Sequence, residues 1–199
     1  MFITTKIYRP DTDYRKAKAA IERSLETLGL DYIDLMLIHE PYASSQEMYA
    51  AMKEAYASGK LRAIGISNFS ESRYLSFARD CGIIPAVNQV ESHVYFPQRR
   101  LQSAMEGFGT KMQAWTPFTE GRRNIFDEPV LKRIGMKYGK SSTQVALKYL
   151  IQNGIAAIAK TSKELRLKEN IGLFDFTLDD SELREISGMD CRKSLFCWY

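Results

Sequence analysis

The chain has 199 residues, which is enough for one large domain with a real hydrophobic core. Its composition is ordinary for a globular protein, and the net charge of +4 comes from basic residues scattered along the chain. This pattern argues against a nucleic-acid surface and fits an anionic small molecule somewhat better.

The three cysteines, Cys81, Cys191 and Cys197, are odd in number and form no CxxC motif. Neither a disulfide framework nor a metal site is therefore indicated. No apolar run approaches the roughly 18 residues of a membrane span, and the first residues do not resemble a signal peptide. We expect a cytoplasmic protein that does not bind a membrane.

Runs of apolar, β-branched and aromatic residues predict six strands. These are residues 2–8, 34–38, 61–69, 86–91, 111–118 and 155–160. Helical spacing of apolar residues and capping residues predict helices after each strand. These are residues 11–29, 45–59, 70–82, 98–108, 129–138, 141–154, 163–172 and 179–187. Ser45 is a plausible N-cap of the helix over residues 45–59. Ser141 and Gln144 have the spacing of a capping box, and Asp179 and Glu182 have the same spacing. The polar residues 120–124 predict a loop.

Residues 34–41 are central to this prediction. The apolar run from Leu35 to Ile38 ends at His39, and Pro41 prevents simple continuation of the strand. Such a run is typical of a strand buried on both faces of a parallel sheet. His39 then lies at the carboxyl end of a buried strand, where α/β proteins place their chemistry. The alternative is a structural histidine.

Strands and helices alternate, which predicts a parallel sheet that is either doubly wound or closed into a barrel. No GxGxxG follows a strand, as a Rossmann sheet would require. Polar or aromatic residues instead follow the strands, as at the functional rim of a TIM barrel. They are Lys6, His39, Ser67, Asn68, Gln89, Trp115, Thr116, Lys160 and Thr161. A full barrel has eight strands, so the missing pair is expected upstream of residue 1.

Five segments resemble the aldo-keto reductases, an NADPH-dependent TIM-barrel family. They are residues 31–39 (DYIDLMLIH), 62–69 (RAIGISNF), 87–91 (VNQVE), 114–118 (AWTPF) and 160–170 (KTSKELRLKEN). The resemblance covers nearly the whole chain and is nearest to the bacterial diketogluconate reductase and prostaglandin F synthase-like type. It implies one α/β domain over residues 1–199, a TIM barrel truncated to about six βα units, in an enzyme that reduces aldehydes and ketones.

In this family a tyrosine is the general acid, a lysine lowers its pKa, an aspartate pairs with the lysine, and a histidine orients the carbonyl. Lys6 matches the lysine and His39 matches the histidine. A phenol with a pKa of ~10 is protonated at neutral pH, and a nearby cation stabilises the phenolate that it leaves. Taken alone, Lys6 could be a solvated strand end.

The resemblance also implies an NADPH site. The residues that match the nicotinamide contacts are Ser67, Asn68, Gln89 and Trp115. Those that match the start of the loop along the pyrophosphate are Thr116 and Phe118. Those that match the 2′-phosphate clamp and the adenine contacts are Lys160, Thr161, Arg166, Glu169 and Asn170. A helix start with Lys and Arg can bind a phosphate, although an ordinary basic helix start, a turn at Asn68 and core packing of Trp115 are the alternatives.

The sequence departs from the family pattern at Ala159, at Thr161 and in the segment before Lys6. Ala159 replaces the usual proline, and Thr161 replaces the usual serine. The aspartate and the acid tyrosine come from a segment upstream of Lys6, and Tyr8 lies after the lysine and does not fill that role. His93 is expected to be structural. Two functions follow: a carbonyl reductase that is impaired in these 199 residues, or a non-catalytic protein that binds NADPH or interacts with another protein. With either function, exposed barrel edges would allow the chain to self-associate.

Overall fold

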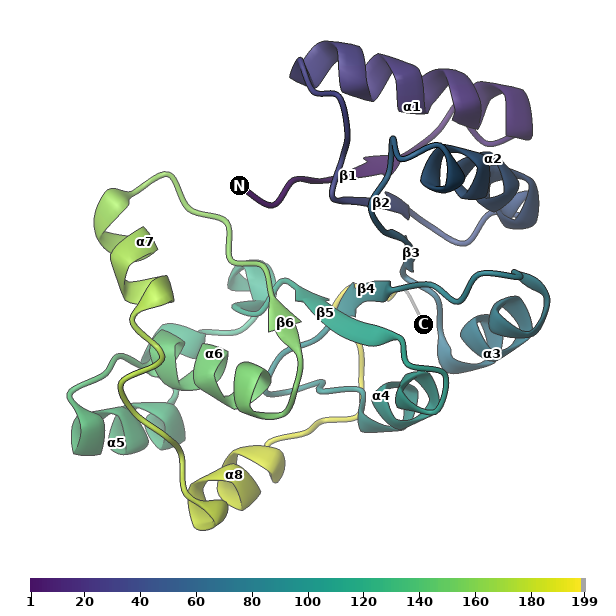
Figure 1. The fold of residues 1–199 in the computed structure, drawn as a ribbon. Helices are drawn as coiled ribbons and strands as arrows, with labels where there is room; N and C mark the ends of the chain where they lie inside the picture. Colours follow the sequence, from purple (N-terminus) through teal and green to yellow (C-terminus); the bar gives the residue numbers. More distant parts are fainter. Residues whose placement is uncertain (198–199) are drawn as a thin grey trace. The chain divides into compact units, whose positions relative to one another are not determined.

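The computed structural model describes residues 1–197. Its six strands are β1 (Thr4–Ile7), β2 (Leu35–Ile38), β3 (Ile64–Ser67), β4 (Val87–Glu91), β5 (Lys111–Trp115) and β6 (Ala156–Ala157). Its α-helices are α1 (Tyr14–Leu28), α2 (Ser45–Ala57), α3 (Glu71–Asp80), α4 (Arg99–Glu106), α5 (Pro129–Tyr138), α6 (Ser142–Gln152), α7 (Glu164–Ile171) and α8 (Asp180–Ser187). The predicted alternation of strands and helices is confirmed (Figure 1).

The chain divides into two compact units, the first of residues 1–89 and 100–111 and the second of residues 90–99 and 112 onward. In the first unit, β1 pairs with β2, β2 with β3, and β3 with the start of β4, all parallel. Helices α1 and α2 pack side by side against these strands (Figure 1). Parallel neighbours bring the strand ends to one edge, so the register decides which side chains meet there.

The centre of the first unit is formed by β2 and β3, whose residues are all buried. The uninterrupted apolar run of residues 35–38 predicted this burial for β2. Gly65 in β3 faces β2 and β4 closely. A Cβ atom at Gly65 would lie 2.5 Å from the Val87 carbonyl oxygen and 2.7 Å from a Leu37 methyl carbon. Only glycine therefore allows this spacing of the three strands.

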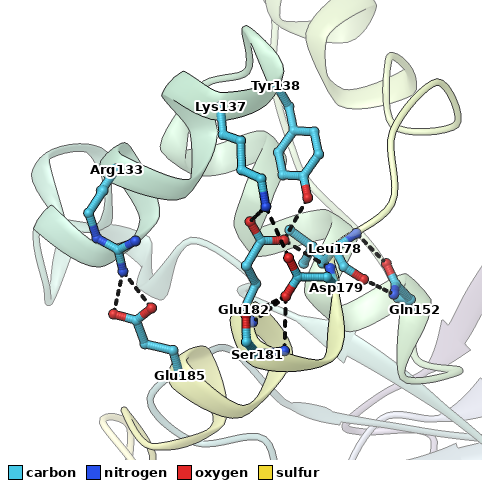
Figure 2. Close-up of polar contacts among 9 residues, drawn as sticks. All are labelled: Arg133, Lys137, Tyr138, Gln152, Leu178, Asp179, Ser181, Glu182 and Glu185. Carbon is cyan, nitrogen blue, oxygen red and sulfur yellow. Dashed lines mark hydrogen bonds and ion pairs between the residues drawn. The ribbon is translucent and has the colours of Figure 1, made fainter.

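In the second unit, β5 and β6 pair in parallel, with Gln113 opposite Ala156. Helix α5 packs against α6 and α8. Figure 2 shows Lys137 and Tyr138 of α5 converging on the Glu182 carboxylate of α8, at 2.9 and 2.7 Å. Glu182 also closes a capping box with Asp179, so one buried carboxylate both starts α8 and attaches it to α5.

Glu182→Gln should lower the free energy of unfolding at pH 7 by about 1–2 kcal/mol, because it removes charge-assisted hydrogen bonds. Burial opposes ionisation of Glu182, but the bonds from Tyr138, Lys137 and the Asp179 backbone outweigh burial and lower its pKa. This stabilisation is complete above the ordinary carboxyl pKa of 4.5 and is lost as the pH falls through the lower folded-state pKa. Urea unfolding at pH 7 and at acid pH measures both effects.

Glu185→Gln is the matched control, since its exposed pair with Arg133 should contribute less than about 1 kcal/mol (Figure 2). Equal destabilisation by the two substitutions would contradict the assignment of Glu182 as the main attachment of α8.

Three local predictions need correction. Ser44, not Ser45, is the N-cap of α2, because the Ser45 hydroxyl bonds Tyr42 instead. Residues 120–124, predicted as a loop, include part of a 3₁₀ turn at Thr119–Gly121. The Thr119 hydroxyl donates a hydrogen bond to the Arg123 carbonyl and accepts one from the Arg123 N–H. The strand expected over residues 155–160 is only Ala156–Ala157, with one further bond from Ile158 to Ala114. No helix of the described residues is long and apolar enough to cross a membrane.

Candidate active site and cofactor site

The register of β1 and β2 determines how Lys6 and His39 lie relative to one another. Lys6 pairs with Leu37, two residues before His39, so both side chains lie on one face near the carboxyl ends of adjacent strands. The His39 backbone N–H donates to the Ile7 carbonyl at 3.1 Å and fixes the strand end. The structure therefore brings together the two residues that the resemblance identifies as catalytic.

Burial sets the charges of this pair. It lowers the pKa of Lys6 from 10.5 to about 8, so the ammonium is still mostly charged at neutral pH. Burial and then the Lys6 charge lower the pKa of His39, partly offset by the Glu40 carboxylate 3.7 Å from Nδ1. At neutral pH the site thus combines a cation with a neutral imidazole.

Tyr8 is the residue that sequence reasoning undervalued. Its ring meets the His39 ring edge-on, with the centroids 4.7 Å apart, and it is 52% exposed. The signal was present in the sequence, because Lys6 and Tyr8 are two residues apart in the strand predicted over residues 2–8 and would share a face there. In the structure Tyr8 comes directly after β1. A third ionisable side chain therefore lies beside the pair.

Ser67, Asn68 and Gln89 meet where β3 ends beside the middle of β4. The Ser67 hydroxyl and the Asn68 N–H both donate to the Gln89 carbonyl, at 2.8 and 2.9 Å. The Asn68 amide donates to the His39 carbonyl at 3.1 Å, which links this group to the Lys6 pair. Asn68 has a φ of 63°, a left-handed conformation that asparagine tolerates better than most residues. All three are buried.

Trp115 and Thr116 end β5 in the second unit. Thr116 is β-branched and has a φ of 56°, a strained conformation of the kind that clusters at functional sites. Its Oγ1 is buried and has no hydrogen-bond partner within the described residues. The Phe196 ring lies 5.0 Å from the Trp115 ring, and Arg122 donates to the Leu195 carbonyl at 3.1 Å. The carboxyl-terminal segment thus contacts the expected nicotinamide-stacking residue.

Arg166 projects from α7 toward the ring of Phe126, which in turn lies near the ring of Phe118. Its guanidinium carbon lies 5.9 Å from the centroid of Phe126, and the Phe126 and Phe118 rings are 6.4 Å apart. Cation–π contact at this distance positions the guanidinium without using its hydrogen-bond donors. Within residues 1–197 those donors form no hydrogen bond, so they can bind an anion.

The remaining residues of the expected clamp lie at the start and end of α7. Lys160 is exposed, and the Thr161 hydroxyl accepts from the Lys163 N–H at 3.1 Å. Glu169 and Asn170 are half-buried near the carboxyl end of the helix. No hydrogen bond or ion pair joins Lys160 or Thr161 to Arg166 in the part of the chain that the structure describes.

Sequence reasoning missed the role of Glu91. Its buried carboxylate contacts His93 Nε2 at 3.2 Å, the Ser194 hydroxyl at 2.5 Å and the Leu195 N–H at 2.8 Å. Burial raises the pKa of Glu91, but these bonds outweigh it and lower the pKa overall. Full burial of His93 against Glu91 fits its expected structural role. Among residues 1–197, no three His, Cys, Asp or Glu side chains group as a metal site.

Comparison with known proteins shows the family of this chain. The sequence profile of the Aldo/keto reductase family matches residues 1–190. The chain is 39% identical to glyoxal reductase of Bacillus subtilis (strain 168) over 191 residues, which is 96% of this chain and 68% of that enzyme.

Two solved structures extend the likeness to the fold. An aldo-keto reductase from a Medee basin deep-sea metagenome library has a TM-score of 0.96 and 33% identity over 98% of this chain and 73% of its own. A Bombyx mori aldo-keto reductase in complex with NADP has a TM-score of 0.91 and 32% identity over 98% of this chain and 69% of its own. The expected parallel α/β fold of aldo-keto reductase type is confirmed, and the chain belongs to the aldo/keto reductase family.

Proposed function

We propose that this chain takes part in NADPH-dependent reduction of small aldehydes and ketones to alcohols. The observation that carries the proposal is the placing of a half-buried, charged Lys6 near a neutral His39 at adjacent strand ends. Glyoxal reductase, which the chain resembles, is named for a small carbonyl substrate. Membership in the aldo/keto reductase family supports an oxidoreductase function.

The buried polar atoms suit NADPH. Ser67, Asn68 and Gln89 place a hydroxyl and two amides at this strand edge, where each already has a partner within the protein. The Thr116 Oγ1, which has no hydrogen-bond partner within residues 1–197, can bond a polar ligand. We assign the Trp115 face to the nicotinamide, Thr116 and Phe118 to the pyrophosphate, Lys160, Thr161 and Arg166 to the 2′-phosphate, and Glu169 and Asn170 to adenine. The Bombyx mori relative was crystallised with NADP.

Bound NADPH supplies the hydride, and the chain supplies position and charge. A neutral His39 imidazole can donate a hydrogen bond to the carbonyl oxygen, which orients the carbonyl and stabilises the negative charge that develops there. Lys6 adds a positive field at the same oxygen. Neither group replaces a phenol as the proton donor, so we propose that catalysis by these 199 residues is impaired.

A second function deserves a test because none of the tyrosines in residues 1–199 matches the acid of the family. The chain could bind NADPH without turnover and act through another protein. Both functions predict the same cofactor contacts and differ only in hydride transfer. We further propose a cytoplasmic location, which suits three unpaired cysteines.

Hydrogen exchange with and without NADPH tests the proposed site. We expect NADPH to slow amide exchange at residues 67–69, 115–119 and 160–171, since these segments carry the assigned contacts. Unchanged exchange at all three segments under saturating NADPH would contradict the site.

Lys6→Met should raise the free energy of unfolding at neutral pH while weakening catalysis, because methionine avoids burying a charge. In the unsubstituted chain the free energy of unfolding should rise from about pH 8 toward 10.5, where the unfolded chain binds more protons than the folded chain. Urea unfolding between these pH values should show this rise, and Lys6→Met should reduce it. An identical slope in both proteins would contradict the lowered pKa.

We expect the isolated chain to self-associate or to melt at low temperature. Within the described residues β1 pairs only with β2, and Phe2 is 68% exposed near that edge. On α7 and beyond, Leu165 and Phe174 are 70% and 76% exposed. Size-exclusion chromatography with light scattering and thermal unfolding measure this, and a monomer that melts sharply at high temperature would contradict it.

A further inference from the structure

Helix α7 carries Arg166, Glu169 and Asn170, but none of its residues is buried. Leu165 and Ile171 are 70% and 69% exposed. Packing of apolar side chains therefore contributes little to the position of this helix. Some other contact must fix it if its side chains are to meet a cofactor in a defined geometry.

Polar side chains hold its carboxyl end. The Gln144 Nε2 amide donates to the carbonyls of Glu169 and Gly172, both at 3.1 Å. Lys140 Nζ donates to the Gly172 carbonyl at 3.2 Å, and Lys148 Nζ donates to the Leu173 carbonyl at 3.0 Å. The Glu169 carbonyl, in the last turn of α7, also accepts from the Gly172 N–H at 3.1 Å, and the other two carbonyls lie just after the helix. The carboxyl end of a helix favours positive charge, so these donors hold the end of α7 and the residues that follow it.

Both the oxygen and the nitrogen of the Gln144 side-chain amide form hydrogen bonds. Its Oε1 accepts from the Ser141 N–H at 3.1 Å and completes the capping box of α6. Its Nε2 lies so near Gly172 that a Cβ atom there would come within 3.3 Å. The side chain is buried, and it ties the start of α6 to the end of α7.

We propose that Gln144 is a positioning residue that fixes α7 and so sets the preference of Arg166 for the extra phosphate of NADPH. Arg166 and Glu169 are three residues apart and lie near one face of the helix. Release of the Glu169 carbonyl would let the turn that carries Arg166 shift. This inference rests on the proposed function, because the ligand of Arg166 is assigned there.

Gln152 provides a matched control in the same helix. Its Nε2 donates to the Leu178 carbonyl at 2.7 Å, and its Oε1 accepts from the Leu178 N–H at 3.1 Å (Figure 2). It therefore makes the same kind of double contact with a backbone. The segment that it holds leads into α8, which carries none of the assigned cofactor residues.

The experiment compares Gln144→Glu with Gln152→Glu in the full chain, by titration with NADPH and NADH. Each substitution keeps an acceptor, removes a donor and adds one negative charge to α6. We expect Gln144→Glu to weaken NADPH binding about tenfold and to speed amide exchange in α7. NADH binding should weaken less, because NADH shares the adenine contacts of Glu169 and Asn170 but not the phosphate contact of Arg166. Gln152→Glu should keep the NADPH preference. Gln144→Met, which adds no charge, should lose the preference as Gln144→Glu does.

Equal weakening of both cofactors by Gln144→Glu, or full NADPH preference in Gln144→Met, would overturn the positioning role. If the unsubstituted chain prefers NADPH and Gln144→Glu keeps that preference, the proposed function stands and only the positioning role of Gln144 is overturned. An unsubstituted chain that binds neither cofactor would overturn the proposed function and this inference with it.

Discussion

Residues 1–199 alone are expected to oxidise NADPH with small aldehydes only slightly above the background rate. Hydride transfer builds negative charge on oxygen, and a proton must arrive as it does so. His39 can polarise the carbonyl, and Lys6 can stabilise the negative charge on its oxygen, but neither occupies the position of a phenol acid. Positioned general acid catalysis contributes typically ~10²–10⁴-fold, and the missing acid should cost a factor of this size.

The test fuses the amino-terminal segment of a relative such as glyoxal reductase in front of residue 1 and follows NADPH absorbance. Activity should rise by the factor above, and His39→Ala in the fused protein should lower it again. The contradictory outcome is robust reductase activity from residues 1–199 alone that Lys6→Met abolishes. That outcome would assign the acid role to another residue, and Tyr8 against His39 would be the first to substitute.

Arg166→Ala is expected to weaken NADPH binding by about tenfold or more, with NADH binding largely kept. A charge-assisted hydrogen bond contributes roughly 1.5–3 kcal/mol, and the guanidinium beside Phe126 has its donors available for the 2′-phosphate. Isothermal titration with both cofactors measures the ratio. Arg184→Ala is the control, because Arg184 bonds the Asp180 carbonyl of its own helix. Equal weakening for NADPH and NADH in Arg166→Ala would rule out the phosphate assignment.

Local sequence signals predicted the elements that depend on local physics. The apolar run before His39 became the fully buried β2, and the spacing of Ser141 with Gln144 and of Asp179 with Glu182 became capping boxes. These features depend on residues close together in the chain. Lys6 and His39 are farther apart in the chain, but they end two consecutive predicted strands, and the parallel register of these strands brings them together.

Features that depend on distant contacts were not predictable. The Phe196 ring meets Trp115 from far along the sequence, and Glu91 binds Ser194 and Leu195 across a similar separation. The strained φ of Thr116 carries no sequence signature, because threonine normally avoids it. The capping box predicted one partner of Gln144, but its bonds to α7 depend on how two helices meet.

The most direct test of the NADPH site is an equilibrium titration of the unsubstituted chain with NADPH and with NADH, followed by cofactor fluorescence. The account predicts saturable binding at one site, with a Kd for NADPH at least about tenfold below that for NADH. Absence of saturable NADPH binding, or equal affinity for the two cofactors, would contradict it.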